Sequence, residues 1–136
     1  MRILVIGFLT ISIFISCSNL KQVNKNVSVP RLKFINSIEI PYNQEFENTK
    51  IGGLSGIDYD KKNDLYYIIC DERSQENLSR FYTAKININN DKVQAIDFQQ
   101  THTLKNEIGN SFGSWLTTPE TSADPEDIRY NPKTNT

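Results

Sequence analysis

Apolar and polar residues alternate over several stretches of the chain, and this period of two predicts β-strands. The clearest case is a hairpin over Ile57–Cys70. Its first arm alternates Ile57 and Tyr59 with aspartates, whereas its second arm, Leu65–Cys70, is a continuous apolar run, as expected of an inner strand covered on both sides. The turn Lys61–Asp64 contains Asn and Asp, which tolerate the left-handed backbone of a tight turn.

Three further segments carry a strand signal. Leu32–Ile40 gathers its apolar residues on one side, and Arg80–Ile88 and Val93–Leu104 flank an Asn-Asn-Asp-Lys turn. Val93–Leu104 is the most polar of the three, so we expect it at the edge of a sheet. No stretch of this region combines a 3.6-residue period with helix caps, and the helix content is therefore expected to be low.

A weak internal repeat organises these strands. Pro125–Asn135 can be laid over Leu54–Asp64, so that Ile128 matches Ile57 at an offset of 71 residues. A blade enlarged by a loop gives such a spacing. The pattern predicts an all-β, partial β-propeller-like fold with antiparallel four-stranded blades. We expect it to be truncated, because the strand equivalent to Leu65–Cys70 would begin near the last residue, and because open blades need neighbours to cover them.

The first residues differ in character from the rest. Arg2 precedes the apolar run Ile3–Ile15, which is short for a membrane span of about 20 residues and is typical of an export signal. The Ser-Cys pair ending at Cys17 resembles a bacterial lipobox, which implies cleavage before Cys17 and lipidation of its thiol. An uncleaved anchor or an ordinary secretory signal are the alternatives.

This interpretation divides the chain into three parts. We expect a lipoprotein signal peptide over residues 1–16, a lipidated cysteine with a flexible polar tether over 17–30, and the β-domain over 31–136. The domain would then be held at the cell envelope, on the outer membrane or the periplasmic face. The N-terminal lipid would bind the domain to the membrane.

Charge and cysteine content narrow the classes of function. The 15 basic and 16 acidic side chains nearly balance, so there is no electrostatic reason to expect nucleic acid as a partner. If Cys17 is lipidated, Cys70 has no partner for a disulfide, and its apolar surroundings favour a buried, structural thiol. His102, the single histidine, lies in a polar strand and is expected at the surface.

Lys105–Ser122 breaks the strand pattern and is predicted to be a long loop. Loops of this length in small domains are more often functional or mobile than structural. Trp115, within this loop, is a candidate lid or contact residue. Large aromatic side chains are usually buried, however, and we therefore favour the interpretation that Trp115 covers an edge of the core.

The order of motifs in Ile51–Ile88 points to a family. The segment contains Gly-Gly-Leu-Ser-Gly, Ile-Asp-Tyr, an aromatic strand, Asp-x-Arg and Arg-Phe-Tyr. Together with the later Ala123–Pro132, these motifs resemble the phytase-like family, also described as the esterase-like activity of phytase; Asp127 replaces its usual Gly. The resemblance implies a secreted, propeller-like domain longer than this chain, and a hydrolase of phosphoric esters or esters that acts on a phosphorylated or ester small molecule.

Candidate chemistry lies where the strands end. We expect Asp71, Arg73 and Glu126 as catalytic residues, with Arg73 gripping a phosphate, and Asp71, Asp124 and Glu126 as ligands of calcium, which prefers oxygen. The alternative is ordinary turn chemistry with an ion pair between Asp71 and Arg73. A noncatalytic propeller that binds a ligand or partner at the cell envelope is the competing function.

Three glycines and a serine could also be taken for functional residues, but their context argues against this. Gly52, Gly53 and Gly56 are expected to allow close backbone packing, and do not form a phosphate cradle because no helix follows them. Ser55 precedes a strand and therefore lacks the context of a catalytic nucleophile.

Overall fold

The computed structural model describes residues 31–136; the expected signal peptide, Cys17 and the tether lie outside this range. It is all-β, with one two-stranded and one four-stranded sheet. The strands are β1 (Glu45–Phe46), β2 (Thr49–Lys50), β3 (Leu54–Asp60), β4 (Leu65–Cys70), β5 (Arg80–Asn89) and β6 (Lys92–Thr103), and a three-residue 3-10 turn, η1 (Pro119–Thr121), follows. No helix within residues 31–136 is long and apolar enough to cross a membrane.

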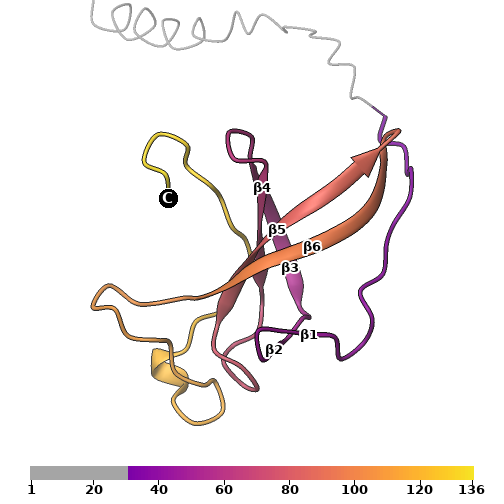
Figure 1. Ribbon diagram of the computed structural model, residues 1–136. Coiled ribbons are helices and arrows are strands. Elements are labelled where there is room, and N and C mark those ends of the chain that lie inside the picture. Colours follow the sequence, from indigo (N-terminus) through magenta and orange to yellow (C-terminus); the bar gives the residue numbers. More distant parts are fainter. Residues whose placement is uncertain (1–30) are drawn as a thin grey trace, which may run out of the picture. The chain divides into compact units, whose positions relative to one another are not determined.

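The larger sheet is an antiparallel meander in the order β3-β4-β5-β6 (Figure 1). This is the order of an open, propeller-like blade, and it confirms the predicted hairpin and the two strands that follow it. The polar β6 lies at the edge, as predicted. Asn90 and Asp91 join β5 to β6 with φ of 50° and 59°, the conformation of a two-residue turn that matches the twist of the strands.

The turn between β3 and β4 is built by its own side chains. The Asp60 carboxylate accepts hydrogen bonds from the backbone N–H of Lys62, at 2.9 Å, and from Asn63. The Tyr59 hydroxyl donates to the Asp64 carboxylate at 2.8 Å, and Asp64 itself has a φ of 51°.

The same turn recurs 71 residues later. Asn131 accepts a hydrogen bond from the backbone N–H of Lys133 at 3.0 Å, and the Tyr130 hydroxyl donates to Asn135 at 2.9 Å. Asn135 has a φ of 60°, and its counterpart in the first copy, Asp64, has a φ of 51°. The weak sequence repeat therefore corresponds to a repeated local structure. Residues 125–131 form no strand, although the repeat predicts one, because no described neighbour supplies a ladder of backbone hydrogen bonds.

One side of the sheet carries the core. Residues from β4, β5 and β6 meet there, and the segment before β3 covers them. The buried members are Ile51, Ile68, Cys70, Tyr82, Ala84 and Phe98. Phe46 of β1 packs its ring 5.9 Å from that of Phe98, so the small β1–β2 hairpin, which the sequence pattern did not predict, closes one end of the core.

The opposite side of the sheet is covered by the C-terminal segment, drawn in yellow in Figure 1. The Tyr130 ring stacks on Tyr67 of β4 with centroids 5.1 Å apart, and the Tyr130 backbone N–H donates to the Asp58 carboxylate at 2.8 Å. Gly56 permits this approach, because a Cβ there would lie 2.7 Å from a carboxylate oxygen of Asp127.

The predicted strand over Leu32–Ile40 is wrong. This segment has no regular structure and attaches to β6 through a side chain. Asn36 donates to the carbonyl of Val93 at 2.8 Å and accepts from its N–H at 3.1 Å, and Glu47 accepts from the N–H of Thr101 at 2.7 Å. These side chains satisfy part of the exposed edge of β6, which would otherwise invite further strand pairing.

The buried side chain of Arg80 joins the two sheets. The Arg80 side chain is 2% exposed and donates to the Glu72 carboxylate, the Tyr82 hydroxyl and the Lys50 carbonyl. Glu72 also accepts the backbone N–H groups of Glu76 and Asn77. Burial alone would raise the pKa of Glu72, but these hydrogen bonds hold it below its ordinary value. The hydrogen bonds of Glu72 and Arg80 therefore hold the β4–β5 loop in place.

Removal of the Glu72 carboxylate is expected to be costly, because it leaves the buried Arg80 charge without its anionic partner. We expect Glu72→Ala to lower the free energy of unfolding by about 3 kcal/mol in urea denaturation. Glu76→Ala, which removes the exposed partner of Lys50, is the matched control and is expected to have little effect. Equal losses in the two variants would contradict this assignment.

Attachment of the C-terminal segment is expected to weaken in acid. The N–H groups of Tyr130 and Tyr59 hold the pKa of Asp58 below its ordinary value. A carboxyl group whose pKa is lowered by folding stabilises the folded state at pH values above about 3.9, its pKa in the unfolded chain. This stabilisation is lost as the pH falls through the pKa of the folded state. The amide chemical shift of Tyr130 should follow that titration in NMR spectra. A midpoint above the ordinary value, or an unchanged profile in Asp58→Asn, would disprove the contact.

Candidate functional site

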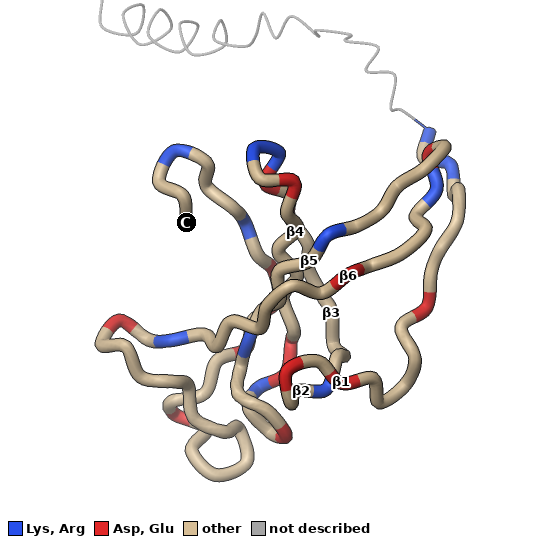
Figure 2. The backbone as a smooth tube through the Cα atoms, in the orientation of Figure 1, with Lys and Arg blue, Asp and Glu red and all other residues tan. Residues whose placement is uncertain are grey.

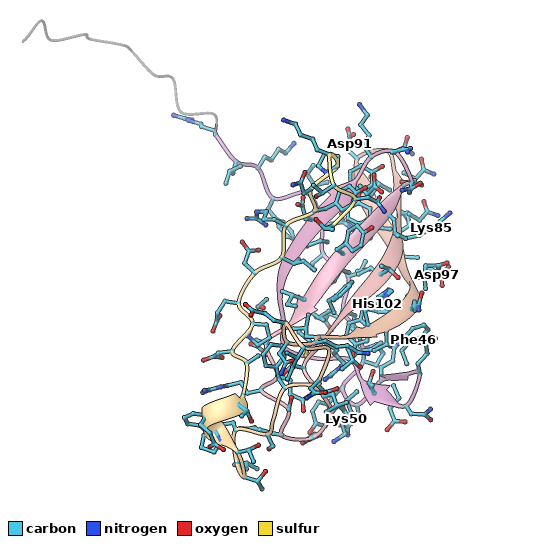
Figure 3. All side chains as sticks on the ribbon, turned by 90° about the vertical axis from the view of Figure 1, so that its left-hand side faces the viewer. Phe46, Lys50, Lys85, Asp91, Asp97 and His102 are labelled. Atoms are coloured by element: carbon cyan, nitrogen blue, oxygen red, sulfur yellow. The ribbon has the colours of Figure 1, made fainter. Side chains whose placement is uncertain are left out.

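A cleft of about 730 Å³ opens between the β1–β2 region and the β4–β5 loop. Three segments supply most of its lining, which consists of Ile40–Asn43, Lys50–Gly53 and Asp71–Arg73, together with Gln75, Glu76 and Arg80. Figure 3 shows that Lys50 lies towards the end of the sheet opposite Asp91 of the β5–β6 turn. The cleft thus receives two of the predicted site residues, Asp71 and Arg73.

Asp71 follows β4 directly and is held at the cleft by its backbone. Its N–H donates to the carbonyl of Gly53 at 2.7 Å, while its side chain remains exposed. Gly53 has a φ of +56°, and a Cβ there would lie 2.0 Å from an Asp71 carboxylate oxygen, so both the backbone conformation and the close approach favour glycine. Close packing is therefore confirmed at Gly53, as at Gly56, but not at Gly52, whose added Cβ would meet nothing.

Arg73 is paired with a distant acid. Its Nε lies 3.5 Å from the Asp124 carboxylate, and the pair with Asp71 that the alternative interpretation required is not formed. The guanidinium carbon also lies 3.7 Å from the centre of the Trp115 ring. Trp115 is 42% exposed, so it does not serve mainly as a cover for the core. The structure therefore joins the Asp-x-Arg motif to the later Asp-Pro-Glu motif.

The remaining predicted acid, Glu126, is exposed. Within residues 31–136, no group of three or more His, Cys, Asp or Glu side chains is placed to hold a metal ion. Asp71, Asp124 and Glu126 therefore do not form a joint ligand set there. Calcium, which takes 6–8 oxygen ligands, does not fit these three residues by themselves.

Most of the other charges at the cleft are already paired. Lys50 lies 2.6 Å from Glu76, and Arg80 is engaged by Glu72. Figure 2 shows acidic and basic residues interspersed along the chain rather than gathered by sign. The cleft therefore has no strong field of one sign.

Cys70 and His102 do not line the cleft. Cys70 is 1% exposed, donates its thiol to the carbonyl of Gly52, and has its pKa raised by burial, as expected of a structural thiol. His102 differs from the prediction of a surface residue. It is half-buried and stacks on Phe81 with ring centroids 4.5 Å apart, and burial lowers its pKa.

The contact between Trp115 and Arg73 was not predicted. The two residues lie on different loops, and nothing in their spacing indicates that they meet. The only available signal was the coincidence of the chain's one tryptophan with an unusually long loop near an Asp-x-Arg motif.

Comparison with known proteins identifies a family. No curated protein and no solved structure matches the chain. The model of the phytase-like family, described as the esterase-like activity of phytase, matches residues 49–136. The match begins at β2 and includes the whole four-stranded sheet, the Trp115 loop and the second copy of the repeat. Because it spans more than half of the chain, the protein belongs to the phytase-like family.

Proposed function

We propose that this domain hydrolyses phosphoric esters or esters at the cell envelope, where lipidated Cys17 anchors it. The contact between Arg73 and Asp124 carries the proposal, because it brings together two family motifs that are far apart in the sequence. The family match supports hydrolase-like chemistry, and the cleft beside Arg73 offers room for a small molecule.

The residues at the cleft suit this chemistry in part. Hydrolysis of a phosphoric ester requires neutralisation of charge on the phosphoryl oxygens. Arg73 supplies a planar guanidinium, which grips oxyanions with two parallel hydrogen bonds. Asp71 supplies an exposed carboxylate nearby in the sequence, suited to orient water. Glu126 is assigned a supporting acid–base role. No step is assigned to calcium, since the three acids are not grouped.

A noncatalytic binding module is the second candidate. The observation that favours it is the pairing of charges at the cleft: Lys50 with Glu76, and Arg80 with Glu72. Groups held in such pairs are less available for proton transfer. Binding of a phosphorylated ligand without turnover would identify this alternative.

Hydrolysis of p-nitrophenyl phosphate and p-nitrophenyl acetate by the full chain tests the proposal. We expect Arg73→Gln to lower kcat/KM by about a hundredfold, the cost of removing one preorganised donor. Asp71→Ala and Glu126→Ala are also expected to reduce the rate. Parallel assays with calcium and with a chelator establish whether the metal contributes.

Arg129→Gln is the matched control, because Arg129 is an exposed arginine paired with the neighbouring Asp127. It is expected to retain full activity. Full activity of Arg73→Gln would remove Arg73 from the site. Absence of turnover with retained binding of phosphate would replace the hydrolase by the binding module.

The membrane anchor has its own test. We expect Cys17→Ser to abolish metabolic labelling of the protein with a fatty acid and to prevent cleavage before residue 17, because the thiol is the proposed acceptor of the lipid. Cys70→Ser is the matched control and should be labelled like the natural protein. Labelling that persists in Cys17→Ser would exclude the lipoprotein assignment.

A further inference from the structure

Arg73 has hydrogen-bond donors that the protein does not use. Its Nε is buried and has no hydrogen-bond partner, and its carboxylate neighbour Asp124 lies 3.5 Å away. Arg80, in contrast, donates to four groups, and Arg129 donates to Asp127 and to a carbonyl. The donors by which a guanidinium binds an oxyanion with two parallel hydrogen bonds include its terminal N–H groups, which lie beyond the buried Nε.

Trp115 is held against Arg73 by the backbone. Its N–H donates to the carbonyl of Arg73 at 3.0 Å, and its ring lies beneath the guanidinium. The turn that presents the ring is tight, because the N–H of Thr118 donates to the carbonyl of Ser114 at 2.8 Å. A Cβ on Gly113 would lie 2.2 Å from the Thr118 hydroxyl oxygen, so this part of the loop is closely packed.

Stacking fixes a guanidinium without using its donors. The ring of a tryptophan attracts the flat face of the cation, whereas the N–H groups of the guanidinium lie in its plane. Trp115 therefore restricts the orientation of Arg73 and leaves its N–H groups to another partner. Trp115 is 42% exposed and is not part of the core, and it touches the cleft only through Arg73.

We propose that Trp115 is a positioning residue, which holds Arg73 so that the guanidinium binds an oxyanion in the cleft. The proposal rests on the proposed function in that both assign Arg73 to the anionic group of the ligand. It adds that the loop Lys105–Ser122 belongs to the site. The ligand chemistry is an oxyanion, supplied by either a phosphate or a carboxylate.

The affinity of the full chain for inorganic phosphate and for acetate tests this proposal, measured by NMR titration of the Arg73 amide in a non-ionic detergent. We expect Trp115→Leu to weaken binding of the preferred anion about three- to fivefold, the value of an exposed cation–π contact. Trp115→Phe, which keeps an aromatic ring, should restore most of the affinity. Preference between the two anions identifies the source of the oxyanion.

Leu116→Ala is the control, since Leu116 neighbours Trp115 and is 71% exposed. It should bind like the natural protein. Equal affinity in Trp115→Leu and the natural protein would overturn the positioning role, as would the absence of binding to either anion. Ring-dependent binding without turnover of p-nitrophenyl esters would sustain this proposal and reject the hydrolase, so the two failures are distinguishable.

Discussion

The buried guanidinium of Arg80 is the constraint on which the rest of the structure depends. A charge that is 2% exposed is tolerated only when its donors are satisfied, since desolvation of an unpaired ion costs several kcal/mol. Glu72, the Tyr82 hydroxyl and the carbonyl of Lys50 meet this requirement. These partners come from the β4–β5 loop, β5 and β2, so one residue ties the small hairpin to the large sheet.

The same pairing places the candidate site. Glu72 is held by Arg80, and its two neighbours in the sequence, Asp71 and Arg73, line the cleft beside this pair. Asp71 is exposed, whereas Arg73 reaches Trp115 and Asp124. One short loop therefore carries both Glu72, which forms a structural ion pair, and Arg73, the candidate functional cation. Loss of the ion pair would displace Arg73, so the stability of this loop and the geometry of the candidate site are linked.

The sequence predicts the elements whose signals are local. Alternation and Asn-Asp turns locate β3 to β6, because side-chain period and turn chemistry act within a few residues. The strand expected at Leu32–Ile40 fails because a strand also needs a free partner, and Asn36 satisfies the edge of β6 by its side chain instead. Trp115 and Asp124 contact Arg73 although they are far from it in the sequence. The spacing of residues along the chain does not predict contacts of this kind.

The repeat explains how the second copy lies on the first. Gly56 and Asp127 occupy equivalent positions at the offset of 71 residues, and these two residues are in contact. A Cβ on Gly56 would collide with Asp127, so the glycine in one copy permits the aspartate in the other. Asp58 then binds the N–H of Tyr130, the counterpart of its own neighbour Tyr59. Contact between equivalent positions is the stacking expected of repeat proteins, in which each unit covers the next. The departure of Asp127 from the family pattern is thus accommodated by the first copy.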